Sequence, residues 1–192
     1  MKFLPTPILG AVLIETDVFS DERGSFLENY RSTPYAELGA DPFVQDNLSR
    51  SKKAVLRGLH FNVRRPQAQL LTVVRGKIFD VVVDLRRHSA TFGQWFGTEL
   101  SEIGIRQIYM APGFAHGFCV LSDWADLHYK VTSEYDQHDE FGLLWSDQEL
   151  DIAWPLNAPI VSSRDAAFPC LSMLTKDELP CVSMAQNCPN NS

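Results

Sequence analysis

Short runs of apolar and aromatic residues, cut at close intervals by Gly, Pro, Asp and Ser, dominate the chain from about residue 43 to 155. In the run KIFDVVVDL, every second residue from Phe79 to Leu85 is apolar, whereas Asp80 and Asp84 fall on the other parity. Because side chains alternate between the two faces of a strand, this pattern predicts a strand with one inward face. Many short strands separated by turn residues are typical of an all-β sandwich or barrel.

Tight turns at Arg75-Gly76 and at Ser122-Asp123 are each expected to close a hairpin between neighbouring strands. The run WADLHYKV follows the second turn. In this run Tyr129 shares a face with the apolar residues two positions before and after it. Tyr129 therefore points inward if that face does.

Helical signals are sparse. Short helices are expected only around TPYAEL (33–38) and SDQEL (146–150), and the chain has no internal repeat. After residue 175 the hydrophobic periodicity is lost, and Pro, Asn and Ser become frequent. We therefore predict a single domain over residues 1–175, followed by a weakly ordered tail over residues 176–192.

Composition narrows the class of protein. A chain of 192 residues with 45% hydrophobic residues can bury one substantial core, and its net charge of −7 gives no footprint for nucleic acid or an anionic membrane. No apolar run is long enough to span a bilayer. The cysteines show no CxxC spacing and three of the four fall near the C-terminus, which favours reduced thiols and a cytoplasmic location.

His60, in the stretch RGLHFNVRRPQAQ, is the first candidate for chemistry. A mononuclear metal site of the cupin type would be expected to show a His-x-His pair followed by a glutamate. Here the second position after His60 is Asn62, and Arg64 and Arg65 follow. Two cationic side chains beside a divalent metal are electrostatically unfavourable, so we predict no metal at this histidine.

Several stretches together resemble one family, the nucleotide-diphosphate 4-keto-6-deoxysugar 3,5-epimerases related to dTDP-4-dehydrorhamnose 3,5-epimerase. The matching stretches are DERGSFLENY (21–30), FVQDNLSRSKKAVLRGLHF (43–61), FDVVVDLRRHSATFGQW (79–95), APGFAHGFCVLS (111–122), YKVTSEY (129–135) and SSRDAAFP (162–169). The resemblance implies a cupin-type jelly-roll barrel with a few short helices. It also implies a homodimer that acts on a nucleotide-diphosphate sugar without metal or other cofactor.

Epimerisation next to a ketone removes a carbon-bound proton to give an enolate. It needs a base on one face, a proton donor on the other and stabilisation of the oxyanion. The resemblance assigns the base to His60, oriented by Asp165, and the proton donor to Tyr129. An imidazole titrates near neutral pH, and a phenol stays protonated until a carbanion forms, so these residue types suit the two roles.

The resemblance also supplies a binding set. Arg23 and Arg57 match arginines that contact the diphosphate, which guanidinium groups can hold bidentately. On a regular strand Arg57 and His60 would face opposite sides, so we predict a bulge at Gly58 that turns both towards the ligand. The remaining positions expected at base, ribose, phosphate or sugar, partly across a dimer interface, are Phe19, Phe26, Glu28, Gln45, Asn47 and His116.

The chain departs from the family pattern at four positions. Gln69 stands where a lysine is thought to hold the enolate oxygen, and a neutral amide makes a weaker hydrogen bond to an anion than a charged donor does. Leu48, Asn62 and Glu134 replace a histidine, a glutamine and a base-stacking tyrosine, although Tyr135 follows Glu134 directly. These changes leave open a CDP-linked substrate or inversion at only one of C3 and C5.

Two other classes of protein stay in view from the sequence. The first is a metal-dependent cupin, which the missing His-x-His disfavours. The second is a non-catalytic sugar-nucleotide-binding cupin, which the joint presence of His60, Asp165 and Tyr129 disfavours. Because cupin barrels host many functions, only the site residues separate these classes.

Overall fold

The computed structural model describes residues 1–104 and 106–182. In these ranges the ordered elements are strands, one short helix, α1 (Ser32–Ala36), and single-turn 3-10 helices at Asp165–Ala167, Leu171–Met173 and Lys176–Glu178. The strands are β1 (Lys2–Pro5), β2 (Ala11–Glu15), β3 (Val18–Asp21), β4 (Gly24–Leu27), β5 (Gln45–Lys52), β6 (Leu56–Asn62), β7 (Gln69–Arg75), β8 (Lys77–Asp84), β9 (Trp95–Ser101), β10 (Arg106–Met110), β11 (Phe114–Val120), β12 (Trp124–Val131) and β13 (Glu140–Gly142).

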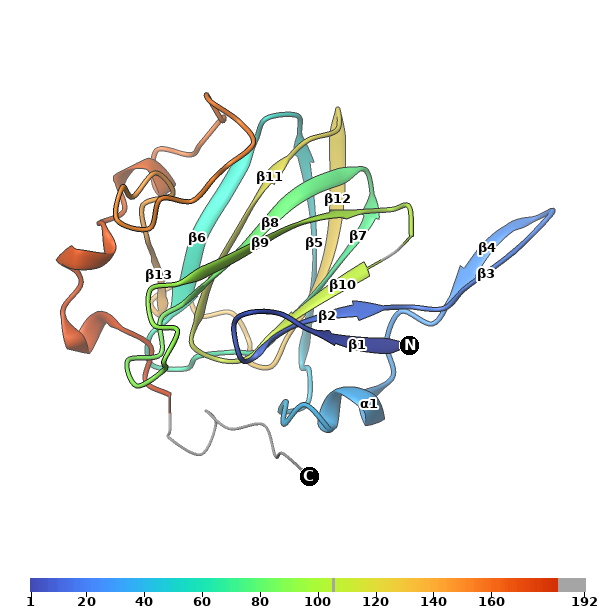
Figure 1. Ribbon diagram of the computed structural model, residues 1–192, viewed down its shortest axis with the longest axis horizontal. Helices are drawn as coiled ribbons and strands as arrows, with labels where there is room; N and C mark the ends of the chain where they lie inside the picture. The colour runs from blue at the N-terminus through green and yellow to red at the C-terminus, as the bar shows by residue number, and fades with distance from the viewer. Residues whose placement is uncertain (105, 183–192) are drawn as a thin grey trace.

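Two antiparallel sheets form the body of the molecule (Figure 1). One has the order β1-β2-β10-β7-β12-β5 and the other the order β13-β6-β11-β8-β9. Strands that follow each other in the chain lie mostly in different sheets, as in a jelly roll. The predicted all-β jelly-roll barrel is confirmed. The β3–β4 hairpin stands apart and projects from the barrel (Figure 1).

Two large hydrophobic clusters lie on opposite faces of the five-stranded sheet. The first fills the space between the sheets and joins Ile78 and Val82 of β8 to Leu71 and Leu127 of the six-stranded sheet. The second lies on the outer face, beneath the chain that follows β13. It includes Val81, Val83, Leu143, Leu150 and Leu179. A third, smaller cluster packs α1 against the six-stranded sheet. The five-stranded sheet is therefore packed on both of its faces.

The strand β8 is buried on both faces, so the expectation of a single inward face is wrong. The parity of Val81 packs under the C-terminal chain, and the parity of Ile78 and Val82 faces the other sheet. Asp80 and Asp84 share the latter parity, and both are 0% exposed. The apolar parity of Val81 therefore lies on the outer face of the sheet, where the chain that follows β13 covers it.

The two predicted hairpins do not form. After Gly76 the chain leaves the six-stranded sheet, and β8 pairs with β11 and β9 instead of β7. After Ser122 it crosses back, and β12 pairs with β5 and β7. The two crossings pack together, because the Lys77 N–H donates to Ser122 Oγ at 2.8 Å and the Leu121 N–H donates to the Lys77 carbonyl at 2.9 Å. A tight turn therefore marks a change of sheet here.

The helix expected at residues 33–38 is present as α1, but the one expected at 146–150 is not. The latter segment is a series of turns, in which Asp147 Oδ1 accepts the Glu149 N–H and Asp147 Oδ2 accepts the Leu171 N–H. Asp151 then has a φ of 46°, outside the helical range. The Asp147 side chain thus accepts backbone N–H groups from a turn and from a distant loop, and the α-type bond from the Asp151 N–H to the Asp147 carbonyl does not extend into a helix.

The chain beyond residue 175 continues in contact with the barrel. Residues Lys176–Glu178 form a 3-10 helix with a capping box, and Leu179 is 8% exposed within the outer cluster. The packed chain therefore extends at least to Leu179. The rest of the predicted tail, residues 183–192, lies outside the described residues.

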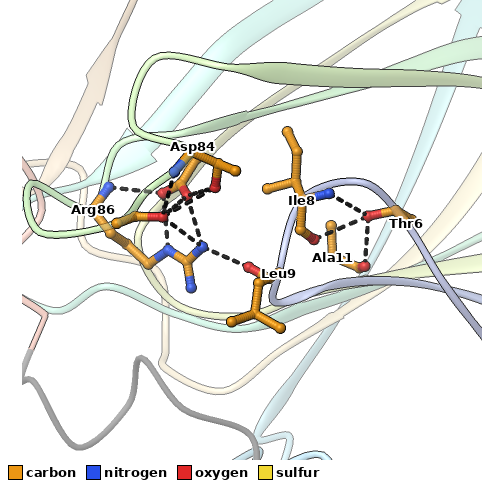
Figure 2. Close-up of polar contacts among 8 residues, drawn as sticks. Thr6, Ile8, Leu9, Ala11, Asp84 and Arg86 are labelled. Atoms are coloured by element: carbon orange, nitrogen blue, oxygen red, sulfur yellow. Dashed lines mark hydrogen bonds and ion pairs between the residues drawn. The ribbon is translucent and has the colours of Figure 1, made fainter.

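A buried ion pair ties the start of the chain to the end of β8 (Figure 2). Arg86 is 3% exposed and donates to both carboxylate oxygens of Asp84, at 2.8 and 2.7 Å, and to the carbonyl of Leu9. Ser89 and Thr91 hydroxyls donate to the same carboxylate. Burial opposes ionisation of Asp84, but these donors outweigh it and hold its pKa below the usual range. The ion pair therefore links the segment at Leu9 to the end of β8.

Candidate active site

A cavity of about 390 Å³ opens between the two sheets. Strands β6 and β11 supply one wall, and β5, β7 and β12 supply the other. Among the residues expected from the sequence to act on a ligand, those that line this cavity are Gln45, Asn47, Arg57, His60, Gln69, His116 and Tyr129. The fold brings together side chains from five strands that are separated by up to 84 residues in the chain.

His60, which lines this cavity, forms a hydrogen-bonded pair with Asp165. His60 Nε2 lies 3.0 Å from Asp165 Oδ1, and the carboxylate is 5% exposed. The second oxygen accepts the Gly58 N–H at 3.1 Å. Burial opposes ionisation of Asp165, but the hydrogen bonds from His60 and Gly58 outweigh it and lower its pKa. An ionised Asp165 fixes the hydrogen of His60 on Nε2, which leaves Nδ1 for chemistry.

Gly58 marks the predicted bulge. His60 lies opposite His116 on β11, whereas Arg57 lies opposite Phe118, so β6 has one residue more than β11 between these pairs. Gly58 has a φ of +117°, and a Cβ there would lie 2.6 Å from Gly117 Cα, so only glycine fits. The bulge is confirmed, and it places both Arg57 and His60 at the cavity.

Tyr129 faces the cavity from the opposite sheet, as its parity predicted. It packs against the inner cluster, and burial is the main reason that the pKa of its phenol is raised, with the nearby Glu140 carboxylate adding to the effect. The phenol therefore stays protonated at neutral pH. His60 and Tyr129 come from different sheets and enclose one cavity, which allows them to act on opposite faces of a bound molecule.

Several polar side chains of the lining are held by hydrogen bonds to residues close in the chain. Arg57 Nε donates to Ser51 Oγ at 2.9 Å, and Gln45 Nε2 donates to Asn47 Oδ1 at 2.8 Å. The Gln69 side chain makes no hydrogen bond to any other described residue, so its amide is available to a ligand. His116 is held differently, through Asp80, at an Nε2–Oδ2 distance of 2.8 Å.

Four of the expected binding residues are not at this cavity. Phe19, Phe26 and Arg23 belong to the projecting β3–β4 hairpin, where Arg23 is 85% exposed and pairs with Asp21 (Figure 1). Glu28 follows the hairpin and pairs with Arg31. A single copy of the chain therefore does not bring this group to its own cavity.

Sequence reasoning missed some of the lining. Glu140 and Arg164 line the cavity as an ion pair at 2.6 Å, and the ring of Tyr135 lies beside them. Arg164 precedes Asp165 in the chain, so the quoted motif SSRDAAFP held the signal for it. Tyr135 lines the cavity and is 60% exposed, whereas the base-stacking tyrosine of the family was expected one residue earlier, at position 134. No group of three or more His, Cys, Asp or Glu side chains arranged to hold a metal occurs in the described ranges.

Comparisons with known proteins agree with this geometry. Residues 5–173 match the family profile of dTDP-4-dehydrorhamnose 3,5-epimerase. An enzyme of that name from Pseudomonas aeruginosa is 46% identical over 168 residues, which cover 86% of this chain and 93% of the relative. A dTDP-4-dehydrorhamnose 3-epimerase from Streptomyces niveus is 43% identical, over 86% of this chain and 81% of the relative.

A crystal structure of a related epimerase matches the fold of this chain. The dTDP-6-deoxy-D-glucose-3,5-epimerase from Legionella pneumophila, solved in complex with dTDP-4-keto-L-rhamnose, matches with a TM-score of 0.91 and 44% identity over 95% of this chain and 98% of the other. Fold, cavity and likeness define the class of protein, a sugar-nucleotide epimerase on a jelly-roll barrel. The chain belongs to the dTDP-4-dehydrorhamnose 3,5-epimerase family.

Proposed function

We propose that the protein epimerises a dTDP-linked 4-keto-6-deoxyhexose at C3, C5 or both through an enolate, in deoxysugar biosynthesis. The observation that carries this proposal is the joint placement of the His60–Asp165 pair and Tyr129 on opposite walls of one cavity. The substrate class follows from the relatives, whose names specify dTDP-4-dehydrorhamnose.

The proposed roles follow from the geometry. Nδ1 of His60 takes the carbon-bound proton, and Asp165 stabilises the imidazolium that forms. Tyr129, kept protonated by burial, returns a proton to the other face of the carbanion, which inverts the centre. A structure that had kept the barrel but lost catalysis would have no reason to keep a buried carboxylate on this histidine, which argues against the purely binding alternative.

The cavity lining includes a cation for the charged part of the substrate. Arg57 contacts the diphosphate in this proposal, and Gln45 and Asn47 contact the nucleotide. Gln69 offers a neutral amide to the enolate oxygen, and such a hydrogen bond contributes about 1 kcal/mol, against roughly 1.5–3 when a charged group takes part. A reaction at one carbon, as the name of the Streptomyces niveus relative specifies, or a CDP-linked substrate fits this weaker site.

The β3–β4 hairpin is proposed to pack on a second copy of the chain and to bring Arg23 and Phe26 to that copy's cavity. Phe19 and Phe26 are directly opposite each other and are 64% and 71% exposed. A cross-strand aromatic pair left in water is typical of an interaction surface. In this proposal the active form is a homodimer.

Replacing Phe19 and Phe26 together by serine should convert the dimer to a monomer and reduce activity. The apolar contact is lost, and so is the delivery of Arg23. Light scattering after size-exclusion chromatography measures the mass. The control is Ile103→Ser, which removes a side chain that is 84% exposed outside the hairpin and should leave the dimer intact. A wild-type protein that is monomeric and fully active would contradict this role of the hairpin.

Proton NMR in D₂O tests the reaction itself. Purified protein is incubated with dTDP-4-keto-6-deoxyglucose, then with its CDP analogue, while the H3 and H5 signals are followed. Loss of both signals with the dTDP sugar is expected for a 3,5-epimerase, and loss of one for a single-carbon enzyme. Exchange only with the CDP sugar would replace the dTDP assignment. Tight binding without exchange from either sugar would establish a binding protein instead.

No helix within the described ranges is long and apolar enough to cross a membrane. The proposal places the enzyme in the cytoplasm, with the cysteine spacing of the sequence as its support.

A further inference from the structure

Asp80 is a carboxylate in a place where the fold alone would favour an apolar residue. It lies in the middle of β8, on the parity that faces the barrel interior, between Ile78 and Val82 of the inner cluster. It is 0% exposed. Burying a carboxylate costs free energy unless hydrogen bonds replace its water, so its retention here calls for a compensating role.

The hydrogen bonds of Asp80 are incomplete. Oδ2 lies 2.8 Å from His116 Nε2, and Oδ1 is buried without a hydrogen-bond partner among the described residues. By contrast Asp84, on the same strand and parity, has its carboxylate held by Arg86, Ser89 and Thr91. Asp84 therefore has the several partners expected of a structural carboxylate, whereas the one hydrogen-bond partner of the Asp80 side chain in the described part of the chain is His116.

That histidine stands beside the catalytic one. His116 lies directly opposite His60 on the neighbouring strand and opposite Val82 on the other side, so His60, His116 and Asp80 run across three strands on one face. Asp80 is the diagonal neighbour of His116, within reach of its ring. Because Nε2 is taken by Asp80 and the ring lines the cavity, the Nδ1 edge remains for a ligand.

We propose that Asp80 is a positioning residue for substrate binding, an inference that rests on the function proposed above. It holds His116 with the ring hydrogen on Nε2, so that Nδ1 accepts a hydrogen bond from a hydroxyl of the sugar. A 4-keto-6-deoxyhexose linked through C1 keeps free hydroxyls only at C2 and C3, so the donor is one of these two. The contact turns the sugar so that its acidic carbon faces His60.

The test is Asp80→Asn, which keeps the shape and reverses the hydrogen bond. The asparagine amide donates to Nε2, the ring hydrogen moves to Nδ1, and the acceptor in the cavity is lost. Nitrogen-15 NMR of the labelled protein should show His116 as the Nε2–H tautomer in the wild type and as the Nδ1–H tautomer in the variant. An unchanged tautomer would overturn the proposal whether or not a substrate is known.

Kinetics supplies the second readout, because proton exchange at the reacting carbon, C3 or C5, can be followed with the full sugar and with its 2-deoxy and 3-deoxy analogues. In the wild type one analogue should lose about 10- to 100-fold in kcat/KM, the effect of an unpaired hydrogen-bonding group. Asp80→Asn should lose a similar factor with the full sugar and little more with that analogue. If removal of the hydroxyl lowered kcat/KM by the same factor in the wild type and in Asp80→Asn, the proposal would be overturned. A wild type without any exchange would refute the proposed function and leave the tautomer result standing.

Stability separates positioning from a structural role. Since Asp80 Oδ1 is unpartnered, Asp80→Asn should melt no lower than the wild type. The matched control is Asp147→Asn, at a carboxylate that is 3% exposed, outside the cavity lining, and accepts two backbone N–H groups. It should melt lower and keep its kcat. A large fall in the melting temperature of Asp80→Asn, with unchanged kinetics, would make Asp80 structural.

Discussion

His60→Asn is expected to lower the rate of solvent exchange at the reacting carbon by about 100- to 10,000-fold, the range that a positioned general base supplies. Asparagine fills a similar volume and can still hydrogen bond to Asp165, but it cannot take a proton at neutral pH. Because Asp165 is buried and ionised, the native pair is arranged to stabilise the imidazolium that the reaction forms. Proton NMR in D₂O with saturating substrate measures the rate.

The matched control is His138→Asn, at an exposed histidine outside the cavity lining, which should exchange at the wild-type rate. Tyr129→Phe separates the two halves of the reaction. It should retain exchange, because the base can return a solvent proton to the face from which it took one, while inverted product falls sharply. Full exchange in His60→Asn would remove His60 from the role of base.

Arg86→Met is expected to lower the free energy of unfolding by about 3–5 kcal/mol, the usual cost of leaving one member of a buried ion pair without its partner. Asp84 is 0% exposed and Arg86 is 3% exposed, so neither is rescued by water (Figure 2). The variant also loses the contact with Leu9 that fastens the first strands. Urea unfolding followed by circular dichroism measures the change.

The pH dependence has a definite sign. The pKa of Asp84 is lower in the folded protein than its ordinary value of 3.8, so the pair stabilises the fold above that pH and its contribution is lost as the pH falls through the folded-state value. The control is Arg106→Met, which breaks an exposed pair with Glu15 and should cost about 0–1 kcal/mol. If Arg86→Met cost no more than this control, the pair would not be a structural link.

Local pattern was enough to identify several features of this protein. Alternating apolar residues predicted the strands, and the parity of Tyr129 predicted that its side chain points inward. The glycine between Arg57 and His60 predicted the bulge in β6. These features depend on a few consecutive residues and on steric rules that hold in any fold. The residue types at His60, Asp165 and Tyr129, with the surrounding motifs, pointed to the same chemistry that the cavity supports.

Tertiary structure decided which strands pair and which faces are buried. A turn such as Arg75-Gly76 has the same local signal whether it closes a hairpin or crosses between sheets, because the choice depends on partners far along the chain. The faces of β8 depend likewise on distant segments, because the parity of Asp80 and Asp84 faces the other sheet and the parity of Val81 is covered by the chain that follows β13. Only the folded chain could show that Asp84 is held in a buried ion pair and that Asp80 is hydrogen-bonded to His116 at the cavity, since burial and hydrogen bonding arise from distant segments.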